Sequence, residues 1–95
     1  MFGAILEKAF AKFHGNYSHT VLGDPRWGVR TLLGAPHIDM PHEDYTVDEI
    51  WDALEAGDAR HDIMQCDTGN GTDNTTNAVG LYNGHAYTIL GVKKI

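Results

Sequence analysis

Cysteine, long apolar runs and clustered basic residues are all scarce in this sequence of 95 residues. The single cysteine, Cys66, excludes an internal disulfide framework and favours a reducing compartment, most simply the cytoplasm. No apolar run approaches the roughly 20 residues of a membrane-spanning helix, and the N-terminus lacks the pattern of a signal peptide. A net charge of −6, with no basic cluster beyond Lys93-Lys94, argues against nucleic acid as a partner.

The remaining composition is that of an ordinary globular protein, with 42% hydrophobic and 21% charged residues. The length suits one small domain or part of a larger one. A chain of this size buries only about 60% of the surface that it exposes when unfolded, so we expect a modest core.

Two helices are expected in the first third of the chain. Residues 2–14 have helical periodicity and end before Gly15, which suits a left-handed helix end. A shorter helix over 25–33 follows Asp24, which can cap it, and stops at Gly34. One face of the first helix gathers the apolar side chains of Phe2, Ile5, Leu6, Ala9, Phe10 and Phe13.

A third helix is expected over residues 46–56. Thr46 and Glu49 have the spacing of a capping box, in which each side chain bonds the backbone of the other residue. Apolar residues then recur at helical spacing, and Gly57 is the expected end of the helix.

Two strands are expected in the last third. Residues 63–66 form a short apolar run, and the Asn83-Gly84 turn precedes a second strand that starts at His85. The polar, glycine-rich residues 67–78 read as a mobile surface loop between them. The predicted fold class is therefore α+β, with about three helices followed by a small antiparallel sheet.

His85 is the residue whose chemistry and local geometry best suit a site, because a side chain beside a tight turn is rigidly held at the end of a sheet. The alternative is a partly buried packing histidine. Cys66 is followed by an aspartate and lies in a strand, so we expect a buried, unreactive thiol. A metal site is a weaker hypothesis, since the possible ligands have no compact spacing: His37, His42, Glu43, Asp44, His61 and Asp62.

The stretch Gly84-His85-Ala86-Tyr87-Thr88 resembles the Gly-His-Ala-Tyr-Ser segment around the catalytic histidine of calpains, which are papain-like intracellular cysteine proteases. Thr88 in place of serine is a mild departure. Three further stretches resemble calpain segments in the same order, and together they cover nearly all of the chain: residues 6–17, 30–35 and 46–66.

The resemblance implies a partial calpain-type catalytic domain over residues 1–95, with 1–22 ending the first lobe and 23–95 starting the second, barrel-like lobe. His85 matches the catalytic base, and Cys66 matches a non-catalytic strand cysteine. The catalytic cysteine and asparagine of the family have no counterpart here. Calcium is implied for the full family domain, but no cofactor or metal residue carries over to this chain.

The resulting hypothesis is a fragment or truncated homologue of a calcium-dependent cysteine endopeptidase that acts on protein or peptide substrates and is inactive as this isolated chain. The alternative is a non-enzymatic pseudo-protease or a module that binds extended peptides along its strands. Incomplete packing is expected to leave apolar surface exposed and to favour self-association, mainly along Phe2, Phe10 and Phe13.

Overall fold

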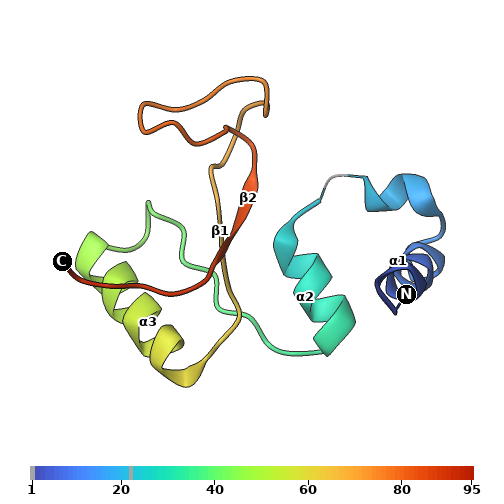
Figure 1. Cartoon of the computed structure of the whole chain (residues 1–95), viewed down its shortest axis with the longest axis horizontal. Coiled ribbons are helices and arrows are strands. Elements are labelled where there is room, and N and C mark those ends of the chain that lie inside the picture. The colour runs from blue at the N-terminus through green and yellow to red at the C-terminus, as the bar shows by residue number, and fades with distance from the viewer. Residues whose placement is uncertain (1, 22) are drawn as a thin grey trace. The chain divides into compact units, whose positions relative to one another are not determined.

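The chain forms two compact units, Met1–Ile38 and Asp39–Ile95, in a computed structural model that describes residues 2–21 and 23–95. The predicted α+β class is confirmed. These units are defined by their compactness and do not test where the lobes of the family domain meet. The predicted lobes, residues 1–22 and 23–95, therefore stay a prediction. Figure 1 shows the elements α1 (Phe2–Phe13), η1 (Tyr17–Thr20), α2 (Pro25–Leu33), α3 (Val47–Arg60), β1 (Met64–Asp67) and β2 (Ala86–Ile89).

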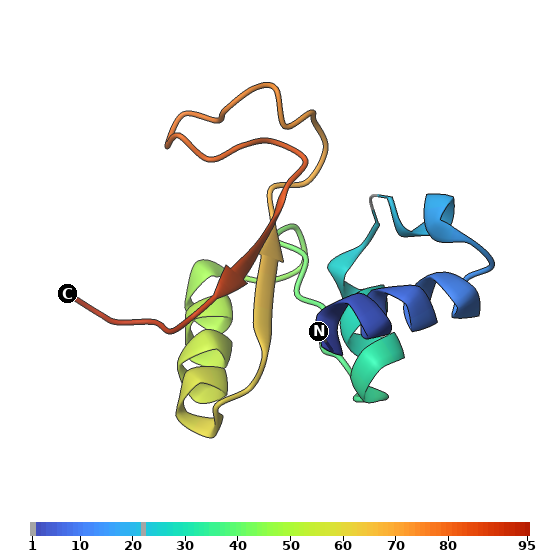
Figure 2. The same cartoon turned by 45° about the vertical axis from the view of Figure 1, so that its right-hand side comes forward.

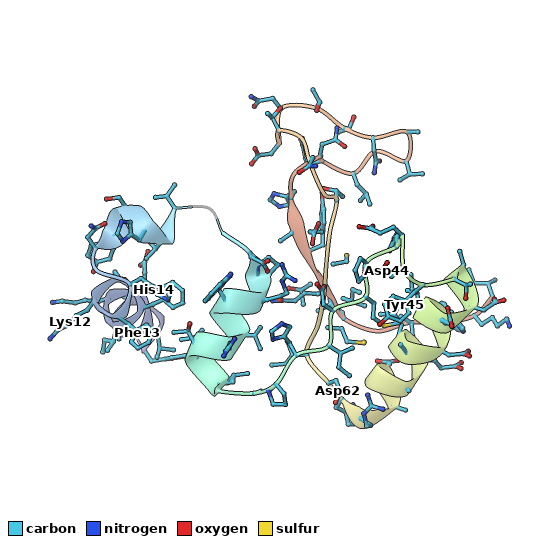
Figure 3. All side chains as sticks on the ribbon, turned by 180° about the vertical axis from the view of Figure 1, so that it is seen from behind. Lys12, Phe13, His14, Asp44, Tyr45 and Asp62 are labelled. Carbon is cyan, nitrogen blue, oxygen red and sulfur yellow. The ribbon has the colours of Figure 1, made fainter. Side chains whose placement is uncertain are left out.

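Helix α1 exposes most of its apolar face. Phe2 and Phe13 are each 77% exposed, as expected. Figure 3 labels Phe13 near the end of α1. Phe10 differs from the expectation, because it is half-buried and packs on the imidazole of His14 with ring centroids 4.3 Å apart. Ala11, 2% exposed, is the one buried hydrophobic side chain in the described ranges 2–21 and 23–95.

Helix α2 has the ends that the sequence predicts. The carboxylate of Asp24 accepts a hydrogen bond of 2.9 Å from the backbone N–H of Arg26 and is also paired with the Arg26 guanidinium. The hydrogen bonds from the Arg26 side chain lower the pKa of Asp24 below its ordinary value. At the other end, Gly34 is left-handed with a φ of 62°.

Helix α3 begins as predicted but ends later. Thr46 and Glu49 form the complete capping box. The prediction that Gly57 ends this helix is wrong, because α3 continues to Arg60 and His61 takes the left-handed conformation with a φ of 61°. Gly57 is instead a packing position, since a Cβ there would lie 2.8 Å from Sδ of Met64 on β1.

Strands β1 and β2 form an antiparallel two-stranded sheet in which Cys66 lies opposite Tyr87. The first strand starts and ends one residue later than predicted. Helix α3 lies beside the sheet, and the segment that follows β2 passes across this helix in both Figure 1 and Figure 2. There the backbone N–H of Val92 donates to Oδ2 of Asp58 over 3.4 Å. Among the described residues, no helix is both long and apolar enough to cross a bilayer.

Candidate active site

His85 lies immediately before β2, after a tight turn formed by Asn83 and Gly84. Gly84 is left-handed with a φ of 58°, and a Cβ at this position would lie 2.4 Å from the carbonyl oxygen of Gly71. The turn therefore requires glycine for two reasons, the backbone conformation and the close approach of the Gly71 backbone. Because of this contact, the start of the long loop between the strands packs directly on its end, the turn before His85.

The backbone of His85 is bonded on both sides to Thr68, its partner one step beyond the last pair of the sheet. The N–H of Thr68 donates to the carbonyl of His85 over 3.0 Å. The N–H of His85 donates to Oγ1 of Thr68, also over 3.0 Å. Two directional bonds of this kind fix the position from which the imidazole extends.

The imidazole of His85 lies near two tyrosine rings. Its centroid is 5.0 Å from the ring of Tyr87, in an edge-to-face arrangement, and 6.5 Å from the ring of Tyr82. The residue is exposed, and neither ring nitrogen has a hydrogen-bond partner within residues 2–21 and 23–95. The imidazole is thus held by aromatic contacts while both nitrogens stay accessible for proton transfer.

Cys66 is not arranged as a partner for this imidazole. It lies within β1 opposite Tyr87, is followed by Asp67, and makes no hydrogen bond to His85 in the described part of the chain. The prediction that its thiol is buried is wrong, since Cys66 is exposed. On this strand the half-buried Met64 lies beside Gly57 of α3, and the three residues after it are all exposed.

The residues weighed as possible metal ligands are not brought together. Among the residues that the structure describes, no three histidine, cysteine, aspartate or glutamate side chains form a group that could hold a metal ion. The His37–Asp44 segment and the end of α3 therefore offer no ligand set for the metal hypothesis.

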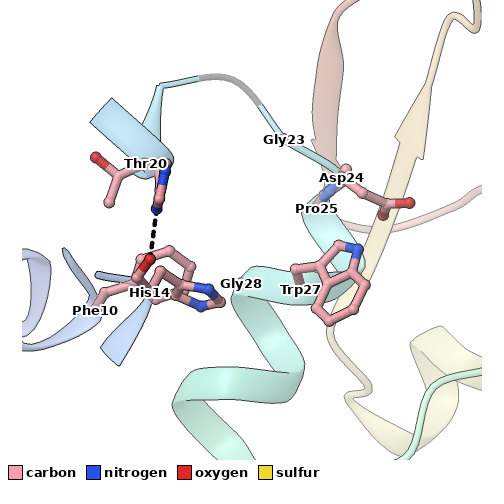
Figure 4. A pocket seen from close by; sticks show the side chains of 9 residues that line it. Phe10, His14, Thr20, Gly23, Asp24, Pro25, Trp27 and Gly28 are labelled. Atoms are coloured by element: carbon pink, nitrogen blue, oxygen red, sulfur yellow. Dashed lines mark hydrogen bonds between the residues drawn. The ribbon is translucent and has the colours of Figure 1, made fainter. Parts of the chain in front are cut away.

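An open hollow of about 590 Å³ lies in the first unit (Figure 4). Its polar side is held by a hydrogen bond of 2.6 Å between Nδ1 of His19 and the carbonyl oxygen of His14. Trp27 borders it and is 59% exposed. His85 is not part of its wall, so this hollow adds nothing to the chemistry of the candidate site.

Two residues of the site were missed by sequence reasoning. Tyr87 carries a usable signal, because it lies two residues after His85 and so shares its face of the strand. Thr68 carries none, since its contact with His85 depends on the pairing register across a loop of 18 residues between Asp67 and Ala86. The loop itself carries side-chain hydrogen bonds that its polar composition did not predict, including Nδ2 of Asn83 to Oγ1 of Thr75 at 2.9 Å.

A family model described as "Calpain family cysteine protease" matches the sequence over residues 1–95. The chain belongs to the calpain family of cysteine proteases. It is 30% identical to human calpain-14 over 93 residues, which cover 98% of this chain and 13% of calpain-14.

Two plant calpain relatives match at the same level. They are the calpain-type cysteine proteases ADL1 of rice (Oryza sativa subsp. japonica) and DEK1 of maize (Zea mays), each 30% identical over 98 residues. These matches cover 97% of this chain and 4% of each relative. The chain therefore spans only a small part of the curated calpains that it matches. No solved structure matches it significantly.

Proposed function

We propose that residues 1–95 are a segment of a calpain-type endopeptidase domain in which His85 is the general base. One observation carries the proposal: an exposed imidazole with both nitrogens accessible stands on a backbone that is bonded on both sides. In this role the imidazole accepts the proton of a thiol, holds the nucleophile as a thiolate, and later protonates the leaving amine. The substrates are proteins or peptides.

The thiol of this reaction is supplied by another part of the protease, outside residues 1–95. Cys66 is unsuited, because the carboxylate of Asp67 follows it and a reactive thiol needs an electropositive setting. An imidazole without its thiol cannot perform the acyl transfer, so the isolated 95 residues are inactive. Calcium dependence and a cytoplasmic location follow from the family resemblance and belong to the same proposal.

The test is an exchange protease, in which residues 1–95 replace the matching segment of an active calpain-type cysteine protease. Thiol-dependent hydrolysis of a fluorogenic peptide is expected in the presence of calcium. His85→Ala should lower kcat/KM by on the order of 10³-fold or more, because it removes the proton acceptor. His42→Ala, which changes an exposed histidine of the same unit, is the matched control and should leave the rate unchanged. Equal rates in the two variants would refute the role of His85.

The isolated chain provides a second test. With the same peptide and calcium, residues 1–95 should show no turnover above buffer. Cys66→Ser is the control, since it removes the one thiol of the sequence. Turnover that disappears in this variant would show that Cys66 is a nucleophile and would contradict the proposal.

A peptide-binding module is the second candidate function, favoured by the open edges of the sheet. Within the described ranges β1 and β2 pair only with each other, so the outer edge of each strand has free backbone groups. An extended peptide could add to such an edge. Titration with an unstructured peptide, followed by amide shifts, tests this: shifts confined to β1 and β2 support it, and no shifts at millimolar peptide contradict it.

A further inference from the structure

The hydroxyl of Thr68 lies between the two ends of the turn that precedes His85. In a closed four-residue turn from Tyr82 to His85, the first carbonyl would accept a hydrogen bond from the last N–H. Here Oγ1 of Thr68 lies between the two groups. It donates to the carbonyl of Tyr82 over 2.7 Å and accepts from the N–H of His85 over 3.0 Å. One side-chain oxygen thus bridges the two ends of the turn.

The same hydroxyl also takes the place of a backbone carbonyl in the hydrogen bonding at the end of the sheet. The N–H of Thr68 donates to the carbonyl of His85, as an antiparallel ladder requires. The N–H of His85 donates to the hydroxyl of Thr68, where a regular ladder would use the Thr68 carbonyl. His85 is therefore held at the point where the ladder stops and the turn begins, and the hydroxyl oxygen of Thr68 is the acceptor that its N–H uses there.

Tyr87 supports the turn from the other strand. Its hydroxyl accepts a hydrogen bond of 3.0 Å from the N–H of Tyr82, while its ring contacts the imidazole of His85. The N–H and the carbonyl of Tyr82 are thus both bonded by side chains, those of Tyr87 on β2 and of Thr68 just after β1. Movement of the turn would carry the imidazole away from the ring that it contacts.

We propose that Thr68 is the positioning residue of His85, setting the imidazole through its hydroxyl bridge between Tyr82 and His85. This inference rests on the proposed function, in which His85 is the base. Thr68 touches no reacting atom, so it acts on the rate only through His85. A displacement of about 1 Å at a reacting group can cost roughly 100-fold in rate, which makes this one hydroxyl important.

The test compares Thr68→Val, which removes the hydroxyl at nearly constant shape, with Thr68→Ser, which keeps it. Thr88→Val is the matched control, because Thr88 lies on β2, is exposed, and makes no side-chain hydrogen bond among the described residues. In residues 1–95, Thr68→Val should speed amide exchange of His85 by about tenfold and remove the nuclear Overhauser contacts between the His85 and Tyr87 rings. Thr68→Ser and Thr88→Val should do neither.

The catalytic readout uses the exchange protease. Thr68→Val should lower kcat by roughly 10- to 100-fold with little change in KM, and Thr68→Ser should restore it. Should Thr68→Val fail to fold, Tyr87→Phe replaces it, since this variant loses only the bond to Tyr82 and should lower kcat in the same direction. Retention of wild-type kcat and His85 exchange in Thr68→Val would overturn the inference, as would retention of both in Tyr87→Phe where Thr68→Val does not fold.

His85→Ala in the same protein separates this inference from the proposed function. Activity that survives His85→Ala refutes the proposed function, and with it any positioning role. An inactive His85→Ala protein beside a fully active Thr68→Val protein refutes the role of Thr68 alone. A loss of kcat in Thr68→Val that serine does not restore also refutes it, because the hydroxyl is then not the cause.

Discussion

The two units of this chain are ordered by different interactions. The first, Met1–Ile38, consists of helices with apolar faces and contains the single buried hydrophobic side chain of the described residues, Ala11. The second, Asp39–Ile95, has no such side chain; its helix α3 lies against β1 at Gly57 and Met64, and the hydroxyl of Thr68 joins the two ends of the segment between β1 and β2. Apolar contacts are non-directional, whereas hydrogen bonds fix angles. The candidate catalytic residue, His85, lies in the second unit, where its backbone is bonded to Thr68, 17 positions away in the sequence.

Among the substitutions that test this comparison, Gly84→Ala in the second unit is expected to change the free energy of unfolding most. The residue is left-handed, and the new Cβ would meet the Gly71 carbonyl at 2.4 Å. We expect a loss of about 2–4 kcal/mol in the free energy of unfolding, measured by urea titration, since backbone strain and overlap add.

Gly28→Ala in α2 is the matched control in the first unit. A Cβ there meets nothing within 4 Å, so the better helix propensity of alanine should stabilise α2 by up to about 1 kcal/mol. If both glycine substitutions change stability by the same amount and sign, the proposed difference between the units is wrong.

A smaller effect is expected from Thr46→Ala at the start of α3. The substitution removes the hydroxyl that accepts from the N–H of Glu49 at 3.3 Å and donates to its carboxylate at 2.9 Å. Loss of an N-cap should destabilise the second unit by about 1 kcal/mol, followed through the fluorescence of Trp51 on the same helix. Thr46→Ser keeps the hydroxyl and should stay near wild type; an equal loss in both variants would contradict the cap.

Local signals predicted the helices well and the site only in part. Asp24, Gly34 and Thr46 are helix ends whose chemistry is readable within a few residues, and the structure places them as expected. The predicted helix end at Gly57 is wrong, because the contact of this residue with Met64 on β1 depends on tertiary packing.

The site shows the same limit. His85 was found from a turn and a strand start, which are local features. Thr68 was not, because its bonds join residues 17 positions apart in the sequence.

We propose that the chain self-associates through the exposed apolar side chains of α1 in the first unit. Phe2 and Phe13 are each 77% exposed, so replacing both with serine should change the free energy of unfolding by no more than about 0.5 kcal/mol. Sedimentation of residues 1–95 should then show a shift toward monomer. Leu90→Ser, at a position 94% exposed in the second unit, is the control. A shift caused equally by Leu90→Ser would mean that association does not depend on α1.

The smallest expected effect is a loss of α2 stability in acid, which depends on the carboxylate of Asp24. The side-chain hydrogen bonds of Arg26 lower the pKa of this carboxyl below 3.8, its ordinary value. A folded pKa below the unfolded one means that the carboxylate contributes stability above about pH 4 and loses it as the pH falls through the folded pKa. Asp24→Asn keeps an N-cap side chain but cannot titrate, so the helical signal of residues 25–33 should become less dependent on pH in this range.

Glu49 has a pKa lowered in the same direction, chiefly by the backbone hydrogen bond from Thr46. Acid should therefore still weaken the start of α3 in the Asp24→Asn variant, and amide shifts followed between pH 6 and about pH 2 distinguish the two helices. An unchanged acid response of α2 in that variant would show that the bond between Asp24 and Arg26 does not stabilise this helix.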